Sequence, residues 1–374
     1  MARIAYIDHS YHKKTLSTDF LPNILRERGH VVDYFWDESW AGGKGIPWEA
    51  VVGYDAVIMF QSQAKICGGY YCSLHPNTIF IPMLDQFGVW KGPLFNLQAF
   101  WEPFQGSKVI SFSTAVHGMA VGSGIRSYYA RYYQKTDTVP NSGDASEVSQ
   151  KKGLRGFFWL RRESDLPWPV IRKLIDHTEF ENFHIHLAHD PGSPSPTLPS
   201  EEEVARFNIT TSTWFEDKAE YNALLQRADV FFVPRMEEGI GQSFLEALSR
   251  GQCVVAPDHG TMNEYILTGL NGFLFDPKDP RPLDFSCARQ LGRNARLAAQ
   301  AGRAAWEENE DKLVNFILAP SAELYADRYQ HAFQAFSSPR QLQAKVRYLT
   351  DRLPLVRRMK PFFRSVIALT GKFR

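Results

Sequence analysis

The sequence has little cysteine and no long apolar run, and both absences restrict what the protein can be. Its 374 residues include four cysteines, Cys67, Cys72, Cys253 and Cys287, which are too few for a disulfide framework in a chain of this length. No window approaches the roughly 18 consecutive apolar residues of a membrane span. The N-terminus becomes polar at Asp8, too early for the apolar centre of a signal peptide. We therefore expect a cytoplasmic protein with reduced thiols.

A strong net charge and a metal-binding motif are also lacking. The formal charge is +1, so no overall field attracts nucleic acid. Cys67, Cys72 and His75 come nearest to a metal motif, but zinc sites do not use this spacing and no second ligand pair accompanies it. His184 and His186 alternate along an apolar run, which is more typical of one face of a strand than of a metal site. We expect neither a bound metal nor a nucleic-acid partner.

Two common nucleotide-binding motifs are absent. The first predicted strand, RIAYI at 3–7, is followed by DHSYHKK and not by the glycines of G-x-G-x-x-G. The chain also has no G-x-x-x-x-G-K-[ST] phosphate loop. These absences argue against a dinucleotide-dependent dehydrogenase and against a P-loop nucleotidase.

Short apolar segments alternate with longer connections, which predicts parallel, doubly wound α/β sheets. In the first half the predicted strands are 3–7, 31–36, 56–60, 78–83 and 108–112, with a helix near 15–28. In the second half they are 156–160, 184–188, 208–215, 229–233 and 253–256, with helices at 168–176, 218–228 and 242–250. Ligands of such sheets bind at the carboxyl ends of the strands.

A polar stretch at about 136–155, rich in serine and turn residues, separates the two sets of strands. We predict an N-terminal Rossmann-like domain over 1–150, a second Rossmann-like domain over 156–320 and C-terminal helices over 321–374. Two such domains leave a cleft between them, where a ligand is expected to bind.

The segment EEGIGQSFLEALSRG follows the apolar strand VFFVP and combines glycines, glutamates and a helix start. Gly239 and Gly241 allow the backbone to approach a ligand or to take a positive φ. The helix predicted from Gln242 offers unpaired N–H groups and a partial positive charge to a phosphate. Glu238 and Glu246 can accept hydrogen bonds from sugar hydroxyls. The alternative is that both glutamates only favour the helix dipole or face solvent.

This segment resembles the signature of the retaining family 4 glycosyltransferases (glycosyl transferases group 1), which have the GT-B fold. It matches E-G-x-G-x-x-x-x-E-A at Glu238, Gly239, Gly241, Glu246 and Ala247, and the pattern continues with Gly251, CVVAP, Glu264 and LNGFLFDP. The resemblance implies two Rossmann-like domains that face a central cleft, with the acceptor on the first domain and a nucleotide-diphosphate sugar donor on the second. It also implies front-face attack, in which the leaving phosphate helps to take the acceptor proton, without a metal or another cofactor.

The resemblance further implies roles for single residues of this segment. Glu246 would accept hydrogen bonds from the ribose hydroxyls, and Glu238 would lie against the transferred sugar. The backbone around the helix start would hold the diphosphate, at Gly239, Gly241, Gln242 and Ser243.

Members of the family also place an Arg at the end of the first strand of the second domain and a Lys about five residues later, both facing the diphosphate. Here WLRRES supplies Arg161 or Arg162, of which Arg161 is the better match. The Lys position holds Pro167 or Trp168, so the usual clamp of two cations is incomplete. A surface ion pair is the alternative role for Arg161.

Polar residues at the ends of first-domain strands are candidates for the acceptor site. Asp85 directly follows a strand, His117 lies in a predicted Gly-rich loop, and His9 follows Asp8 at the end of the first strand. Loop residues at such positions are often functional, although capping and turn roles are alternatives for each. We take Asp85 and His117, together with Glu238, as catalytic candidates. An Asp at position 85 departs from the family pattern.

The C-terminal stretch 340–374 is basic, with ten Lys and Arg residues and one acidic residue, Asp351. Apolar side chains recur at helical spacing in 340–353, and 354–374 mixes apolar and basic residues. The alternatives are packing against the N-terminal domain and contact with an anionic membrane surface. Membrane contact would suit a lipid-linked acceptor and a protein at the inner face of the cell membrane.

The sequence therefore predicts a hexosyltransferase-type enzyme that acts on a glycan or glycolipid acceptor, as in cell-envelope polysaccharide or lipopolysaccharide synthesis. One rival is a GT-B epimerase or phosphorylase, which the family 4 signature disfavours. The other is a non-catalytic subunit that binds a nucleotide sugar, which the missing Lys favours.

Overall fold

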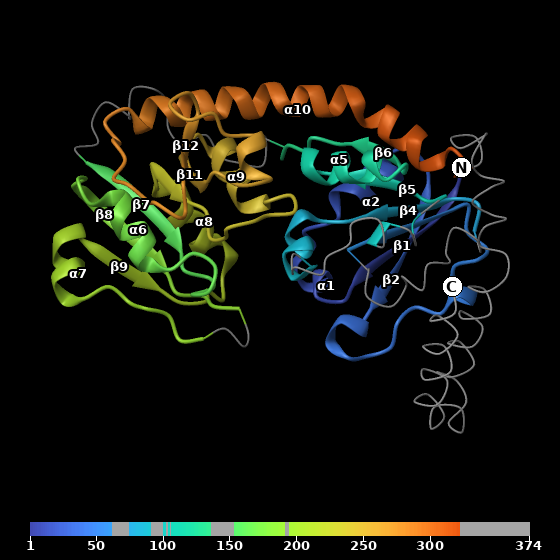
Figure 1. Cartoon of the computed structure of the whole chain (residues 1–374), viewed down its shortest axis with the longest axis horizontal. Coiled ribbons are helices and arrows are strands. Elements are labelled where there is room, and N and C mark those ends of the chain that lie inside the picture. Colours follow the sequence, from blue (N-terminus) through green and yellow to red (C-terminus); the bar gives the residue numbers. More distant parts are fainter. Residues whose placement is uncertain are drawn as a thin grey trace, which may run out of the picture.

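The computed structural model describes residues 1–61, 75–90, 100–101, 104, 106–135, 153–190 and 194–321. Cys67 and Cys72, most of the predicted linker and the basic tail with 354–374 lie outside the described residues. Two six-stranded sheets form the body of the chain, and each is flanked by helices (Figure 1). The predicted α/β class with two Rossmann-like domains is confirmed.

The first sheet has the order β2-β1-β3-β4-β5-β6, and its neighbouring strands pair in parallel. Its strands are β1 (Arg3–His9), β2 (Val31–Asp37), β3 (Ala56–Phe60), β4 (Thr78–Ile81), β5 (Lys108–Ser111) and β6 (Arg126–Tyr129). The helical elements of this half are α1 (His12–Thr15), α2 (Phe20–Glu27), α5 (Thr114–Gly122) and the 3₁₀ turns η1 (Ser39–Ala41), η2 (Trp48–Ala50) and η3 (Leu84–Trp90). Strands β3, β4 and β5 are buried along their whole length, which is why they form continuous apolar runs.

The second sheet has the order β12-β11-β10-β7-β8-β9 and is likewise parallel. Its strands are β7 (Leu154–Trp159), β8 (Phe180–His186), β9 (Ile209–Ser212), β10 (Val230–Phe232), β11 (Cys253–Pro257) and β12 (Gly272–Phe275). The helices are α6 (Trp168–Ile175), α7 (Glu201–Phe207), α8 (Lys218–Arg227), α9 (Gln242–Arg250) and α10 (Ala288–Leu318), with the 3₁₀ turn η7 (Met262–Glu264).

The helix expected near 15–28 is two helices, α1 and α2, because Leu16 takes a left-handed conformation with φ 51° and ends α1. Helix α2 then buries Leu21, Ile24 and Leu25, the i, i+3, i+4 spacing of an amphipathic helix. No element was predicted at β6, β12, α7 or α10; the first three have only four, four and seven residues, whereas α10 is long.

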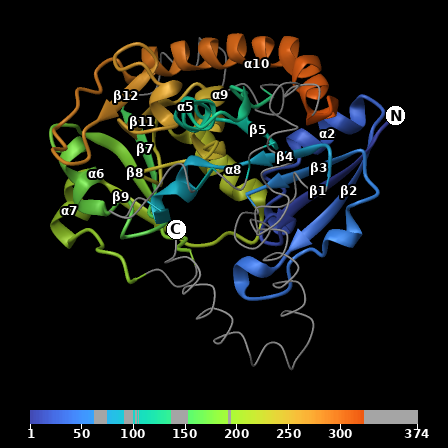
Figure 2. The same ribbon diagram turned by 45° about the vertical axis from the view of Figure 1, so that its right-hand side comes forward.

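Helix α10 is the element that joins the two halves. It has 31 residues and passes from the second domain over to the first, as both views show (Figures 1 and 2). At its end Asn77 donates from Nδ2 to the carbonyl oxygen of Ile317 at 3.1 Å. The last turn of α10 therefore packs on the first domain, although the sequence placed it in the second.

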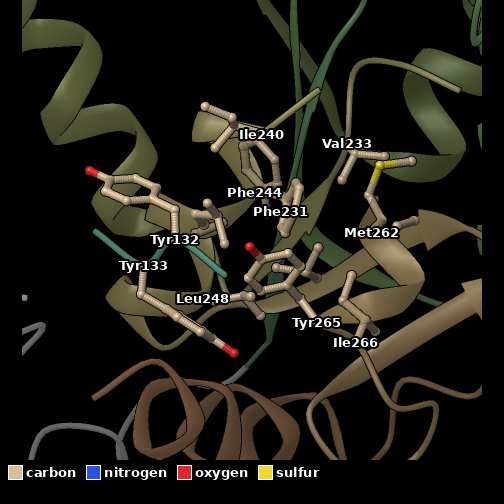
Figure 3. Packing of buried hydrophobic residues seen from close by; sticks show 14 of the residues in the cluster. Tyr132, Tyr133, Phe231, Val233, Ile240, Phe244, Leu248, Met262, Tyr265 and Ile266 are labelled. Atoms are coloured by element: carbon tan, nitrogen blue, oxygen red, sulfur yellow. The ribbon is translucent and has the colours of Figure 1, made fainter. Parts of the chain in front are cut away.

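A continuous apolar core reaches across the boundary between the domains. Tyr133 of the first domain packs edge to face on Tyr265 of the second, with ring centroids 5.1 Å apart. Tyr265 in turn packs on Phe244 of α9 at 5.5 Å, and Figure 3 shows Tyr132 and Tyr133 beside these rings. Burying each such ring contributes about 1.5–3 kcal/mol, so this contact fixes α9 relative to the first domain.

Candidate functional site

The loop between β10 and α9 lies at the carboxyl edge of the second sheet and contacts the first domain. Gly241 caps α9 with φ 78°, and a Cβ there would come within 2.0 Å of the Phe244 ring. A Cβ on Gly239 would come within 2.7 Å of the Met83 side chain in the first domain. Glycine is therefore required at both positions, for the backbone turn at Gly241 and for the close approach of the domains at Gly239.

Arg235 is the centre of a charged cluster in this loop. Its guanidinium lies 3.0 Å from Asp85 of the first domain, 3.5 Å from Asp165 and 3.6 Å from Glu238. Burial lowers the pKa of Arg235, but the three carboxylates together raise it above its usual range. One permanent positive charge thus faces three acidic groups where the two domains meet.

Glu238 is the most buried of these carboxylates, with 8% of the residue exposed. Burial raises its pKa to about 7; the Arg235 charge opposes that rise, and the Asp85 charge adds to it. A carboxyl group that titrates near neutrality can either accept or donate a hydrogen bond. Asp85 has one buried oxygen, Oδ1, without a hydrogen-bond partner among the described residues, so this cluster has an acceptor to offer to a ligand.

Glu246 lies one turn into α9, and its side chain is 40% exposed. Arg250 pairs with it at 2.8 Å, four residues later on the same helix. Gln242 and Ser243 form the first turn, and Gln242 reaches across to the first domain, where its Nε2 donates to the carbonyl oxygen of Ser17 at 3.1 Å. The helix start that the sequence singled out therefore lies against the loop after α1.

Arg161 and Arg162 follow β7 and share one partner. Arg161 donates to Asp190 at 2.8 Å and Arg162 at 2.5 Å. Burial acts to raise the pKa of Asp190, but the two arginines have the larger combined effect, and the pKa lies below its usual value. The positive charge of Arg161 also acts on Glu238, so Arg161 is the arginine that contributes to the field at the loop.

The position of the missing lysine is filled by structural residues. Pro167 is the N-cap of α6 and Trp168 begins that helix. Trp168 is 1% exposed, and its indole N–H donates to Glu203 at 3.0 Å. Neither can supply a second cation.

His117 and His9 differ in their surroundings. His117 lies inside α5 and not in a loop as expected. Its Nδ1 lies 3.0 Å from the Ser127 hydroxyl of β6. His9 ends β1, where its Nε2 lies 3.0 Å from Oε1 of Gln61. Asp85 and Glu238 meet at Arg235, whereas the hydrogen bond of His117 is to Ser127 of β6.

Three further side chains, Asp165, Glu264 and His12, had no role predicted from the sequence. Asp165 accepts from the Met236 amide at 2.8 Å, and only its position among acids after β7 hinted at it. Glu264 crosses the domain boundary and accepts from Ser113 and Thr114 at the start of α5, at 2.9 and 2.8 Å. A carboxylate at a helix N-terminus is favoured by the helix dipole. His12 is the third, and its four-residue spacing from Asp8 was the available signal.

His184 and His186 of β8 contact hydroxyl groups of the neighbouring strand β9. His184 lies between the hydroxyls of Thr210 and Ser212, at 2.9 and 2.8 Å, and His186 also lies 2.9 Å from Ser212. Burial lowers the pKa of each to about 4.

Among the described residues, the ligand atoms of Asp8, His9 and His12 lie within 4.8 Å of one another, the grouping that a metal ion would need.

Within the described part of the chain, no helix has the length and apolar character needed to cross a membrane.

Residues 207–289 match the family model of glycosyl transferases group 1, a stretch that includes the whole loop and α9. No curated protein matches the chain. Three solved structures are similar, each over 84% of this chain. Anabaena Alr3699/HepE in complex with UDP and glucose has 14% identity and a TM-score of 0.59 over 100% of its own chain. Sucrose-phosphate synthase (tll1590) from Thermosynechococcus elongatus has 15% identity and a TM-score of 0.61 over 98% of its own chain. The lipopolysaccharide outer core galactosyltransferase WaaB has 14% identity and a TM-score of 0.50 over 99% of its own chain. The chain therefore has the two-domain GT-B fold.

Proposed function

We propose that the protein is a glycosyltransferase that moves a sugar from a nucleotide-diphosphate donor to a glycan or lipid-linked glycan, with retention of configuration. The observation that supports it most is the loop from Arg235 to Gly241. It lies within the stretch that matches the group 1 family, and its buried Glu238 shares the Arg235 guanidinium with Asp85 of the first domain. Sugar hydroxyls are natural partners for such carboxyl groups.

The donor would lie along the edge of the second sheet. The amides that begin α9 would hold the diphosphate, since a helix N-terminus favours anions. Arg161 would add a positive charge, and Glu246, which is partly exposed, would accept hydrogen bonds from the ribose. Glu238 would contact the transferred sugar.

The proposed transfer requires groups that stabilise developing charge, and it does not require a nucleophile from the protein. Negative charge develops on the leaving diphosphate, where fixed N–H dipoles and Arg161 stabilise it without reorganisation. We propose that the reaction needs no metal or other cofactor, because these groups lie where the charge appears. Closure of the two domains would exclude water from the donor.

The acceptor would bind on the first domain, at the strand ends that carry His9 and Asp85. One of the similar structures is a lipopolysaccharide galactosyltransferase, which suggests cell-envelope polysaccharide synthesis as the setting. A cytoplasmic enzyme whose tail, 354–374, contacts the inner face of the membrane would suit a lipid-linked acceptor.

A second candidate is a subunit that binds a nucleotide sugar and does not transfer it. The filled lysine position favours this reading, because Pro167 and Trp168 leave the diphosphate one cation short. Intact donor binding without transfer or donor hydrolysis would support the subunit. A product assay separates transfer from epimerase or phosphorylase chemistry.

The test is a thermal-shift panel of UDP-, GDP-, ADP- and CMP-sugars on the wild-type protein and on Glu246→Ala. A ligand at a hundredfold excess over its dissociation constant stabilises the folded state by about 2.7 kcal/mol. We expect one donor class to raise the Tm of the wild type and to lose most of this effect in Glu246→Ala. Glu308→Ala is the matched control, because Glu308 is an exposed carboxylate on α10. If no donor stabilises the well-folded wild type, the proposed function is wrong.

A further inference from the structure

A cavity lies between strand β6 and helix α10. Its volume is about 310 Å³, and its walls come from the segment 128–133 of the first domain and from one side of α10 between 302 and 313. Figure 1 shows α10 passing over β6 on its way along the first domain. Small-molecule sites have volumes of about 300–1,000 Å³, so this cavity has room for one ring-sized ligand.

Small residues of α10 create the hollow. Gly302 and Ala305 lie three residues apart on the helix, and both line the cavity. A Cβ on Gly302 would come within 2.3 Å of the Tyr133 ring, so only glycine lets this ring reach the helix. Ala305 is exposed, and its short side chain leaves the space beside it open. The cavity is therefore specified by the sequence of α10.

The opposite wall is aromatic, and its rings are held in place. Tyr128 packs on Phe316 of α10 with ring centroids 5.4 Å apart, and its hydroxyl donates to the carbonyl oxygen of Asn309 at 3.4 Å. The Tyr129 hydroxyl donates to Glu264 at 2.9 Å. The flat apolar faces of such rings suit the C–H groups of a ligand ring. Because the rings are fixed, a ligand need not order this wall when it binds.

Tyr133 differs from these two tyrosines, because its hydroxyl is not engaged. The residue is 8% exposed. Its main-chain carbonyl accepts from Arg303, but no hydrogen bond among the described residues includes its hydroxyl. Figure 3 shows this hydroxyl directed towards α10, the orange-brown helix at the bottom of the view. A ligand hydroxyl in the cavity can supply the hydrogen-bond partner that Tyr133 lacks in this part of the chain.

The charges of the lining indicate the class of ligand. Arg131 and Glu310 are the two charged residues of the lining, so the cavity has no net charge. The guanidinium of Arg131 lies over the Tyr133 ring at 5.6 Å, and Glu310 pairs with Arg28 and Arg303 at 3.1 and 3.3 Å. The lining thus offers both donors and acceptors. Sugar hydroxyls also donate and accept, whereas an ionised phosphate only accepts.

We infer that this cavity is a second sugar-binding site, which takes one pyranose ring from a glycan or from a free monosaccharide. The ring lies against the tyrosine side chains, and its hydroxyls bind the Tyr133 hydroxyl and the Arg131 guanidinium. The cavity shares no residue with the loop from Arg235 to Gly241. The site therefore goes beyond the proposed function, which places the donor at that loop.

The experiment is saturation-transfer NMR on the full-length protein with glucose, galactose, N-acetylglucosamine and glucuronic acid, each added as the free sugar. Ala305→Trp fills the cavity from α10. Ala304→Trp is the matched control, because Ala304 is an exposed residue of the same helix outside the lining. We expect at least one sugar to give a signal with the wild type and with Ala304→Trp, and this signal to be lost in Ala305→Trp.

Tyr133→Phe is the second variant, since it keeps the ring and removes only the hydroxyl. It should raise the dissociation constant of the same sugar by about two- to tenfold, the contribution of one hydrogen bond. Linear oligomers of that sugar separate the two sources of the ring. A hexamer that binds about tenfold or more tightly than the monosaccharide indicates a glycan, and equal affinities indicate a free sugar.

Three results would overturn the inference. The first is no signal from any sugar with the wild type. The second is an equal signal with Ala304→Trp and Ala305→Trp. The third uses uridine and adenosine as further probes: if Ala305→Trp loses the signal of a nucleoside and of no sugar, the cavity binds a base.

The donor panel keeps this inference separate from the proposed function. Donors should raise the Tm of Ala305→Trp as much as that of the wild type, which also shows that the variant is folded. If no donor stabilises the wild type but a sugar binds in the cavity, only the proposed function is wrong. If a donor stabilises the wild type but no sugar signal depends on Ala305, only the inference is wrong.

Discussion

The guanidinium of Arg235 in the second domain lies 3.0 Å from the carboxylate of Asp85 in the first. This pair joins the two domains where the loop after β10 meets the turn η3 that follows β4. Asp165 and Glu238 reach the same guanidinium, so three carboxylates from separate segments share one arginine.

The raised pKa of Glu238 predicts a pH dependence of stability. The folded-state pKa is about 7 and the ordinary value is 4.5, so the folded protein binds the proton more tightly than the unfolded chain does. Ionising Glu238 therefore costs stability, and the cost grows as pH rises from about 4.5 to about 7. A shift of this size corresponds to about 3 kcal/mol.

Glu238→Gln removes this titration. Relative to the wild type, the variant should gain stability between pH 5 and pH 8, by up to about 3 kcal/mol. The measurement is chemical denaturation of both proteins at the two pH values. Glu308→Gln, an exposed carboxylate, should follow the wild type at both. A difference between Glu238→Gln and wild type that does not change with pH would show that Glu238 is ionised throughout.

Glycine at 241 can be tested against a glycine of the same conformation. Gly241 and Gly269 have φ values of 78° and 76°, but a Cβ at Gly269 would meet nothing within 4 Å. Gly269→Ala should therefore cost only the backbone strain, about 1–2 kcal/mol. Gly241→Ala should cost more, because the Phe244 ring must move, and it should also abolish the donor-induced rise in Tm. Equal thermal shifts and equal donor responses in the two variants would contradict this account.

Much of the architecture follows from local patterns in the sequence. The buried parallel strands were predicted because they are continuous apolar runs, and α9 begins and ends at the predicted residues because Gly241 and Gly251 bound it. Strands β6 and β12 were missed, because RSYY is only partly buried and GFLF is four residues long. Periodicity gives no signal in segments so short.

Some residues of the candidate site could be predicted from local sequence patterns and others could not. The motif identified Glu238 and Glu246, since their spacing from the glycines is local. Asp165 was missed because only the meeting of the loops after β7 and β10 brings it to Arg235. His117 was expected in a Gly-rich loop, but the neighbouring Gly118 and Gly122 lie within α5, where the surrounding residues maintain the helix. Contacts that arise from the packing of distant segments leave no pattern in the chain itself.

Lys108 gives the last prediction, because it fastens α10 to the first domain. Its side chain is fully buried, and Nζ donates to the carbonyl oxygens of Phe316, Ile317 and Ala319 at 2.6, 2.8 and 2.5 Å. These are end-of-helix carbonyls, which have no partner within the helix and favour a cation. Lys108→Met fills a similar volume but removes the donor that these three carbonyls share; Ile317 keeps its hydrogen bond from Asn77, whereas each buried carbonyl left without a partner costs about 1–3 kcal/mol. We expect the Tm to fall by several degrees, and limited proteolysis near 318 to become faster because the helix end detaches. Lys312→Met is the control: Lys312 is an exposed lysine of the same helix that donates to Asn309 within that helix, and its loss should change the Tm little. Similar Tm values for both variants would show that the contacts of Lys108 do not hold the two domains together.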